Sequence, residues 1–272
     1  MKKKNGLFVM ALALMVMFST AAFAENLVIK GSTTVLPITQ KVAEAYMKEN
    51  PDVNISISGG GSGNGIKAII DGTTDIASSS RFIKDSEVKL AIENGAYPVP
   101  FSVAYDCIVP VVHPSNPLNN LSLDQLKDIY MGKVRNWKDV GGNDHPIVVI
   151  SRDTSSGTYE VWEEKVLKKE RVFPGALLQA SNGAVVQGVA NNKNGIGYIG
   201  LGYLTDMVKA ISVNGIVGSE ETTLSGVFPV SRPLFVFTRG WPEGVAAHFI
   251  NYMLNPEKGQ KLVKEAGFVP LF

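Results

Sequence analysis

The chain has 272 residues, of which 45% are hydrophobic and 19% are charged. This composition supplies a buried core for one large domain or two modest ones, and it excludes disorder and coiled coil. A formal net charge of +1 argues against a nucleic-acid-binding protein. The single cysteine excludes an intramolecular disulfide, and the three scattered histidines lack metal-site spacing, so we expect no metal.

The first 24 residues have the three parts of a secretory signal peptide. A basic segment, Lys2–Lys4, precedes an apolar run from Leu7 to Phe18, and Ala22-Phe23-Ala24 matches a cleavage site. The alternative is a membrane anchor, but the apolar run is short for a bilayer. The residues near the cleavage site include no cysteine, so the sequence does not indicate a lipid anchor. We therefore predict cleavage after Ala24 and a periplasmic mature chain that does not insert into the membrane.

Strands and helices are predicted to alternate through the first part of the mature chain. Thr33 and Thr34 are expected to cap the first helix, and Asn50-Pro51 ends it. The second helix is expected to begin at Ile66, after a glycine-rich loop. Repeated strand–loop–helix units favour a mostly parallel sheet with helices on both faces. The predicted strands of this part cover residues 27–30, 53–57 and 75–77.

The same alternation continues toward the C-terminus. Ser122-Leu123-Asp124-Gln125 has the pattern of a capping box and predicts a helix to about Tyr130. Strands are predicted at 147–150 and 196–199, and a helix is predicted with Tyr159, Trp162 and Val166 on one face. Two helices close the chain. The three tryptophans are interpreted as packing residues.

Two long extended runs, 99–112 and 228–238, lie far apart in the sequence and contain prolines. They suit segments that cross between two lobes. We therefore predict a discontinuous lobe of residues 25–106 plus 229–272 and a second lobe of residues 107–228. A ligand cleft between two α/β lobes is the expected site.

Four loops rich in Ser, Thr and Gly precede predicted helices, at 31–34, 59–65, 78–81 and 151–158. Helix N-termini carry unpaired N–H groups and a partial positive charge, so they bind anions. Arg152 adds a full charge and a fork that matches a tetrahedral oxyanion. One such loop alone is ordinarily an N-cap, but four together with an arginine favour an anion site.

Other phosphate-binding patterns fit less well. A Walker loop needs lysine where Ile66 stands, and no acidic residue follows Gly63–Ala68 at the distance a dinucleotide site requires. An enzyme that uses Ser156 as nucleophile is a further alternative. That serine has no histidine near it in sequence and lies outside any G-x-S-x-G motif. We expect neither a cofactor nor catalysis.

Several motifs resemble the phosphate-binding proteins of bacterial ABC-type phosphate importers. They are Gly31–Pro37, Ser58–Lys67, Arg152–Thr158, Asn194–Tyr198 and Pro229–Thr238, in the order of that family. The resemblance covers essentially the whole mature chain. It implies a two-lobed periplasmic-binding-protein fold of type II, with two mostly parallel sheets flanked by helices. It also implies a monomeric receptor that captures phosphate and delivers it to an ABC-transporter permease.

The resemblance also carries over a set of phosphate ligands, and further residues of the same loops are candidates for a second tier. The ligands are Thr33, Thr34, Ser62, Ser80, Arg152, Ser156, Gly157 and Thr158. The second set is Ser32, Arg81, Asp153 and Ser155.

One position departs from the family pattern, because Ser80 stands where well-known members have an aspartate that accepts a proton from phosphate. Ser80 can accept in part, and Asp153 is another candidate acceptor or else an ion-pair partner of Arg152. Arg81 either adds charge to the site or pairs with an acid. A receptor of the same fold for sulfate, molybdate or tungstate therefore stays open as the alternative.

Overall fold

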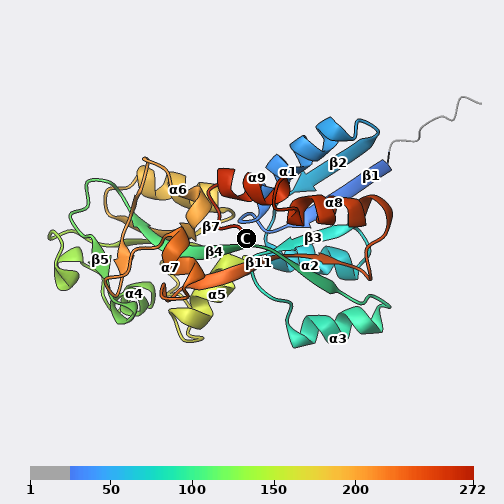
Figure 1. Ribbon diagram of the computed structural model, residues 1–272. Coiled ribbons are helices and arrows are strands. Elements are labelled where there is room, and N and C mark those ends of the chain that lie inside the picture. Colours follow the sequence, from blue (N-terminus) through green and yellow to red (C-terminus); the bar gives the residue numbers. More distant parts are fainter. Residues whose placement is uncertain (1–24) are drawn as a thin grey trace, which may run out of the picture.

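A computed structural model describes residues 25–272, and the predicted signal peptide lies outside them. The chain forms two halves that are joined by long strands in the middle (Figure 1). The strands are β1 (Glu25–Gly31), β2 (Val53–Ser58), β3 (Ile76–Ser79), β4 (Val99–Val112), β5 (Asn120–Leu121), β6 (Val148–Arg152), β7 (Leu177–Gln179), β8 (Gly195–Gly200), β9 (Lys209–Ala210), β10 (Ser212–Val213) and β11 (Ser231–Thr238).

Helices flank these strands on both sides. They are α1 (Leu36–Glu49), α2 (Ser62–Ile70), α3 (Asp85–Glu93), α4 (Leu123–Tyr130), α5 (Gly157–Lys165), α6 (Asn182–Ala190), α7 (Glu220–Leu224), α8 (Gly244–Leu254) and α9 (Gly259–Glu265), with 3-10 turns at Trp137–Val140 and Leu201–Tyr203. No helix within the described part of the chain is long and apolar enough to cross a membrane.

The α/β fold class is confirmed, and the strands follow the order β2-β1-β3-β11-β4-β8-β6-β7, with β9 also paired to β4. Pairing is parallel among β2, β1 and β3 and among β8, β6 and β7. It is antiparallel around β11 and β4. The two mostly parallel sheets that we expected are therefore the two ends of one mixed hydrogen-bonded path.

Strand β4 connects the two ends. Its first part, 99–107, pairs with β11, and its last part, 108–112, pairs with β8. Both extended runs predicted from the sequence are thus strands, and they lie side by side. Their register places Arg232 of β11 directly opposite Asp106 of β4.

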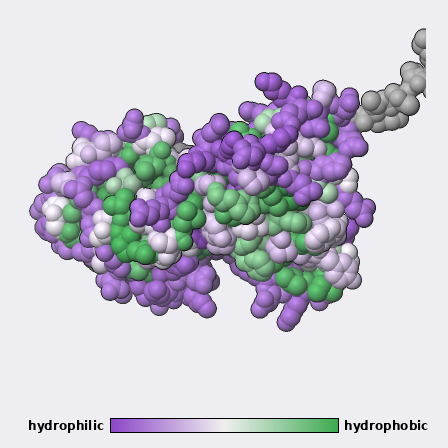
Figure 2. All heavy atoms as spheres, viewed as in Figure 1, coloured by the Kyte–Doolittle hydropathy of each residue, from purple (hydrophilic) through white to green (hydrophobic). Residues whose placement is uncertain are grey.

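Buried apolar side chains form one cluster between Cys107 and Val230 and two others from residues outside that range. Helices α1, α8 and α9 cover one face of the N-terminal strands, and α2 and α3 cover the other (Figure 1). Figure 2 shows the molecule narrowing between its halves, with hydrophobic patches on both. The chain passes between the clusters along β4 and β11.

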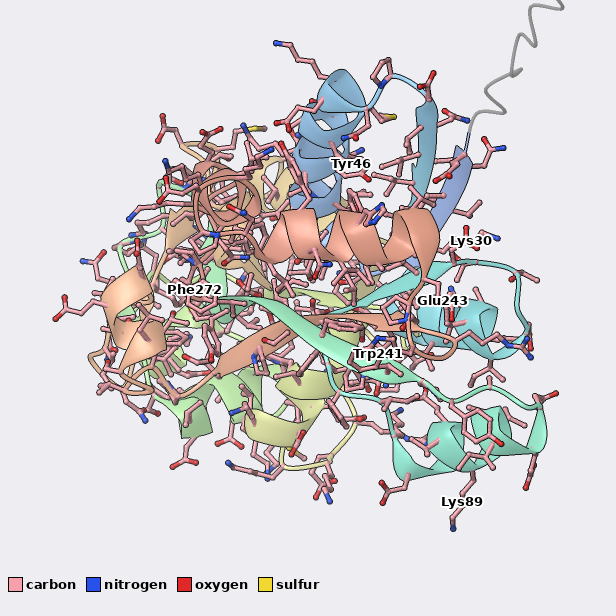
Figure 3. All side chains as sticks on the ribbon, turned by 45° about the vertical axis from the view of Figure 1, so that its right-hand side comes forward. Lys30, Tyr46, Lys89, Trp241, Glu243 and Phe272 are labelled. Carbon is pink, nitrogen blue, oxygen red and sulfur yellow. The ribbon has the colours of Figure 1, made fainter. Side chains whose placement is uncertain are left out.

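Aromatic contacts fix several of these helices. Tyr46 of α1 lies beside α8 (Figure 3), and its ring meets those of Phe249 and Tyr252 edge-on at 5.5 and 5.3 Å between centroids. Trp162 is buried and stacks on Tyr198 at 4.4 Å. The packing role expected for Trp241 is wrong. It is 77% exposed, follows the end of β11, and has a tilted contact with the ring of Phe101.

The helix starts agree with the sequence in part. The capping box at Ser122 is confirmed, since its hydroxyl accepts from Gln125 N and the Gln125 side chain accepts from Ser122 N. The predicted capping by Thr33 and Thr34 is wrong, because the hydroxyl of Ser32 accepts from the amides of Thr34 and Val35. Helix α2 begins at Ser62 rather than at Ile66, so four residues of the glycine-rich loop are helical.

Gly65 sets how closely α2 approaches the strands. A Cβ there would lie 2.7 Å from Gly31 Cα and 2.8 Å from Lys30 O, which are backbone atoms that cannot rotate away. Gly65→Ala is therefore expected to lower the free energy of unfolding by about 1–3 kcal/mol in a denaturant titration. Gly240→Ala is the control, because a Cβ there meets no atom within 4 Å. Equal stability of the two variants would contradict the close packing of α2.

Candidate functional site

The predicted anion-binding loops meet where the strands of the two halves end. Ser32, Thr34, Ser62, Ser80 and Thr158 are each 2% exposed or less. Thr33, Arg152 and Ser156 are buried beside them. Small side chains at these strand ends let backbone from four separate segments converge. The structure therefore brings hydroxyl residues of the four predicted segments together, and Arg152 is buried at the end of β6, where the last of these segments begins.

The closest meeting point joins one hydroxyl from each half. Thr34 Oγ1, just before α1, lies 2.8 Å from Thr158 Oγ1 in the first turn of α5. Next to them, a Cβ on Gly157 would lie 2.4 Å from Ser62 Oγ and 2.8 Å from Ser80 Oγ. Only glycine allows this approach of α5, so Gly157 determines how tightly the halves meet.

Ser62 and Ser80 form a second hydroxyl pair at 3.3 Å, and Ser62 Oγ also accepts from Ser80 N at 3.0 Å. Ser156 is the N-cap of α5, where its hydroxyl accepts from Tyr159 N at 3.2 Å. The oxygen of Ser156 is thus engaged by a backbone amide, while its O–H proton stays available to an acceptor.

Arg152 is 1% exposed and is held by backbone rather than by a close acid. Its Nε donates to Gln179 O at 2.9 Å and its Nη2 donates to Ala180 O at 3.1 Å. Burial lowers the pKa of Arg152, the Asp153 carboxylate opposes this, and the charge of Arg232 adds to it. A guanidinium nevertheless stays protonated in proteins. Its Nη1 is buried without a hydrogen-bond partner among the described residues.

Asp153 lies at the rim of the site. Its Oδ2 is 3.8 Å from Arg152 Nη2, while Oδ1 accepts from Ser155 N at 3.0 Å and contacts the Ser155 hydroxyl. Ser155 also joins the halves, since its carbonyl accepts from Gly63 N at 3.0 Å and its hydroxyl lies 3.1 Å from Gly60 O. Both residues therefore border the hydroxyl cluster.

Arg81 is occupied by carboxylates. Its Nη1 and Nη2 donate to Glu87 at 2.8 and 2.7 Å, and its Nε lies 2.8 Å from Glu160 of α5. Lys84 Nζ lies 2.6 Å from the same Glu160 oxygen. The sequence left two interpretations of Arg81, and the structure shows the ion pair with acids. Arg81, Lys84 and Glu160 line a wide groove of about 830 Å³ beside the site, where cations and acids neutralise each other.

Three polar residues of the site were missed by the sequence analysis. Arg232 Nη2 lies 3.1 Å from Thr158 Oγ1, and its Nη1 donates to Ser80 O at 3.1 Å. Asp106 accepts from Arg232 Nε and Nη2, and Asn182 Nδ2 donates to Thr34 Oγ1 at 3.0 Å. A charged residue inside each apolar extended run, and the asparagine after Ser181, were the available signals.

The buried part of the site carries more positive than negative charge. Two guanidinium groups, Arg152 and Arg232, face one buried carboxylate, Asp106. The N-termini of α2 and α5 add partial positive charge. No group of three or more His, Cys, Asp or Glu side chains within residues 25–272 is arranged to hold a metal ion. The arrangement suits a small anion that accepts many hydrogen bonds.

Comparison with known proteins gives consistent matches. The PBP superfamily domain matches residues 19–257. The phosphate-binding protein PstS of Bacillus subtilis is 31% identical over 247 residues, which cover 90% of this chain and 81% of that protein. PstS of Staphylococcus epidermidis is 35% identical over 254 residues, covering 88% of this chain and 77% of that protein.

Solved structures agree with the sequence matches. A crystal structure from Clostridium perfringens, described as a phosphate ABC transporter substrate-binding protein with bound phosphate, has a TM-score of 0.85 and 36% identity and covers 91% of this chain and 100% of that one. An ABC-type phosphate transport receptor from Vibrio cholerae has a TM-score of 0.72 and 30% identity, covering 89% of this chain and 99% of that one. The chain therefore belongs to the PBP superfamily and, within it, to the phosphate-binding proteins that its motifs resemble.

Proposed function

We propose that this protein is a receptor that captures inorganic phosphate between its two halves and delivers it to the permease of an ABC importer. The observation that carries the proposal is the buried Nη1 of Arg152, which has no hydrogen-bond partner among the described residues and belongs to the residue that opens the loop carrying Ser156 and Thr158. A buried charged donor without an acceptor is costly, so a bound anion is the natural complement. The names of the relatives identify that anion as phosphate.

The donors are sufficient for tight binding. A hydrogen bond to a charged group contributes about 1.5–3 kcal/mol, and micromolar affinity needs about 8 kcal/mol. Thr33, Thr34, Ser62, Ser80, Arg152, Ser156, Gly157 and Thr158 are the proposed ligands. Their number leaves a margin for desolvation and for closure of the halves. Ser32 orders the first loop, and Asp153 and Ser155 border the site.

We assign the halves as lobes of residues 25–106 plus 229–272 and residues 107–228, which turn on β4 and β11. Support comes from the separate apolar clusters on either side of these strands. The contacts of Ser155 with the glycine-rich loop and of Arg81 with Glu160 cross between the lobes. The described conformation is thus the closed one, which we propose is the form that the permease recognises.

A receptor role is favoured over catalysis. Ser156 caps α5, and the contacts recorded for its hydroxyl include no base that would activate it. We also infer that the chain acts as a monomer in the periplasm after cleavage behind Ala24, in line with its signal peptide pattern.

Arg152→Ala tests the assignment of the central ligand. Loss of a buried charged donor is expected to weaken phosphate binding by about 100-fold or more in isothermal titration calorimetry. Arg171→Ala is the control, because Arg171 is an exposed arginine of the same lobe and its loss should change affinity by less than about 2-fold. Unchanged affinity of Arg152→Ala would contradict the site.

Anion competition tests the alternative ligands. Phosphate carries a proton that Ser80 Oγ can accept, whereas sulfate at neutral pH carries none and would set its oxygen lone pairs against that of Ser80. We expect sulfate, molybdate and tungstate each to displace labelled phosphate only at a large excess at neutral pH. Preferential binding of sulfate would favour the alternative function, a receptor of the same fold for another tetrahedral oxyanion.

Glu160→Gln tests the contact between the lobes. It removes the carboxylate that faces both Arg81 and Lys84, so the closed form loses an attraction that the open form lacks. Apparent phosphate affinity is expected to fall about 2- to 10-fold. Glu164→Gln, at an exposed position of the same helix, is the matched control. Equal affinities of the two variants would argue against a role of this ion pair in closure.

A further inference from the structure

We propose that Arg232, held by Asp106, is a positioning residue that orients the paired hydroxyl groups of Thr34 and Thr158 so that one of their two protons is presented to the bound anion. The inference rests on the proposed phosphate site and deepens it. Neither residue belongs to the set of ligands carried over from the sequence motifs. Both lie in the strands that join the lobes, where a buried ion pair is not needed to form the sheet.

The pair is rigidly placed. Arg232 and Asp106 face each other across β11 and β4, and they are 5% and 0% exposed. Asp106 Oδ2 accepts from Arg232 Nε at 3.0 Å and from Nη2 at 2.8 Å. Oδ1 accepts from Leu201 N at 2.9 Å. Burial raises the pKa of Asp106, and Arg232 with the amides of Leu201 and Cys107 opposes that rise. The carboxylate therefore serves as the fixed counter-charge of Arg232.

Arg232 then reaches the hydroxyl pair. Its Nη2 lies 3.1 Å from Thr158 Oγ1 and 3.4 Å from Thr34 Oγ1. Asn182 Nδ2 donates to Thr34 Oγ1 at 3.0 Å and to Thr33 Oγ1 at 3.2 Å. The side chain of Asn182 has a fixed orientation, since its Oδ1 accepts from Gly200 N at 3.2 Å. Every one of these neighbours is a donor, so the threonine oxygens act toward them as acceptors.

The number of hydroxyl protons in this network decides what is left for the anion. Thr34 and Thr158 have one hydroxyl proton each, and one of the two is used in the 2.8 Å bond between them. If Thr34 donates, Thr158 accepts from both Thr34 and Arg232, and its own proton is left over. If Thr158 donates, Thr34 accepts from Thr158 and Asn182, and its proton is left over. In both cases one proton remains without an acceptor in this network, as does that of Thr33, and both are available to an anion.

The arrangement also depends on closure. Thr34 lies before α1 and Thr158 lies in α5, so one guanidinium contacts a hydroxyl from each lobe. Its Nη1 donates to Ser80 O at the end of the third loop. Arg232 thereby arranges three of the anion-binding segments at once, from the strand about which they turn.

The test is a double-mutant cycle in the mature protein with phosphate affinity measured by calorimetry. Arg232→Gln with Asp106→Asn keeps a hydrogen-bonding pair of similar size and leaves no buried charge unpaired. We expect this double variant to bind phosphate about 10-fold or more weakly than the unmodified protein. Arg239→Gln, an exposed arginine just after the same strand, is the control and is expected to bind normally.

The cycle is completed with Thr158→Val. In the unmodified protein this change is expected to lower affinity about 10-fold or more. In the Arg232→Gln/Asp106→Asn background, Thr158→Val is expected to lower phosphate affinity by less than about 3-fold, because the hydroxyl is no longer oriented. If Arg232 and Asp106 had only a structural role, Thr158→Val would lower phosphate affinity equally in both backgrounds. Arg232→Lys, which keeps the charge without the planar fork, provides a second background for the same comparison.

Equal losses from Thr158→Val in all backgrounds, or normal phosphate binding by the double variant, would overturn the positioning role. Failure of the unmodified protein and of Arg239→Gln to bind phosphate would instead overturn the proposed function. The two failures are therefore distinguishable within one set of titrations.

Discussion

The site depends on a buried positive charge that the protein itself does not neutralise. Arg152 is held by the carbonyls of Gln179 and Ala180, and its nearest acid, Asp153, is 3.8 Å away at the rim. Holding a guanidinium by neutral carbonyls leaves its charge available, whereas a close carboxylate would cancel it. The serine and threonine loops, Gly157 and the N-terminus of α5 are arranged around that charge. Arg81 shows the opposite case, because two glutamates take up its donors.

The motifs predicted the loops that converge at the site because each depends on local sequence. Small hydroxyl residues before a helix are required both for capping and for close approach of an anion, and the arginine lies within the same short segment. The sequence patterns placed the starts of helices α1 and α2 less accurately. Ser32 caps the loop before α1 in place of the two threonines, because its position lets one oxygen reach two amides. Helix α2 extends four residues earlier than predicted, since Gly65 packs against the backbone of β1 and Gly63 against that of Ser155.

The missed residues all depend on contacts distant in the sequence. Arg232 and Asp106 are 126 residues apart and become neighbours only through the register of β11 and β4. Asn182 reaches Thr34 across 148 residues. In the sequence each stands alone in an apolar or turn-like stretch, where a polar residue has many ordinary explanations. One partner of Arg81 was missed for the same reason, because Glu160 lies on a helix of the other half, whereas the other partner, Glu87, is six residues away in the sequence.

Sharing β4 between both ends of the sheet links the stability of the two halves. If one half lost its structure, part of this strand would become an open edge with unpaired amides and carbonyls in the half that remained. Partial unfolding therefore carries a penalty on both sides, and thermal melting should follow a single cooperative transition despite the separate apolar clusters. The slowest amide hydrogen exchange is then expected at the centre of this strand, near Cys107, rather than at the middle of either half.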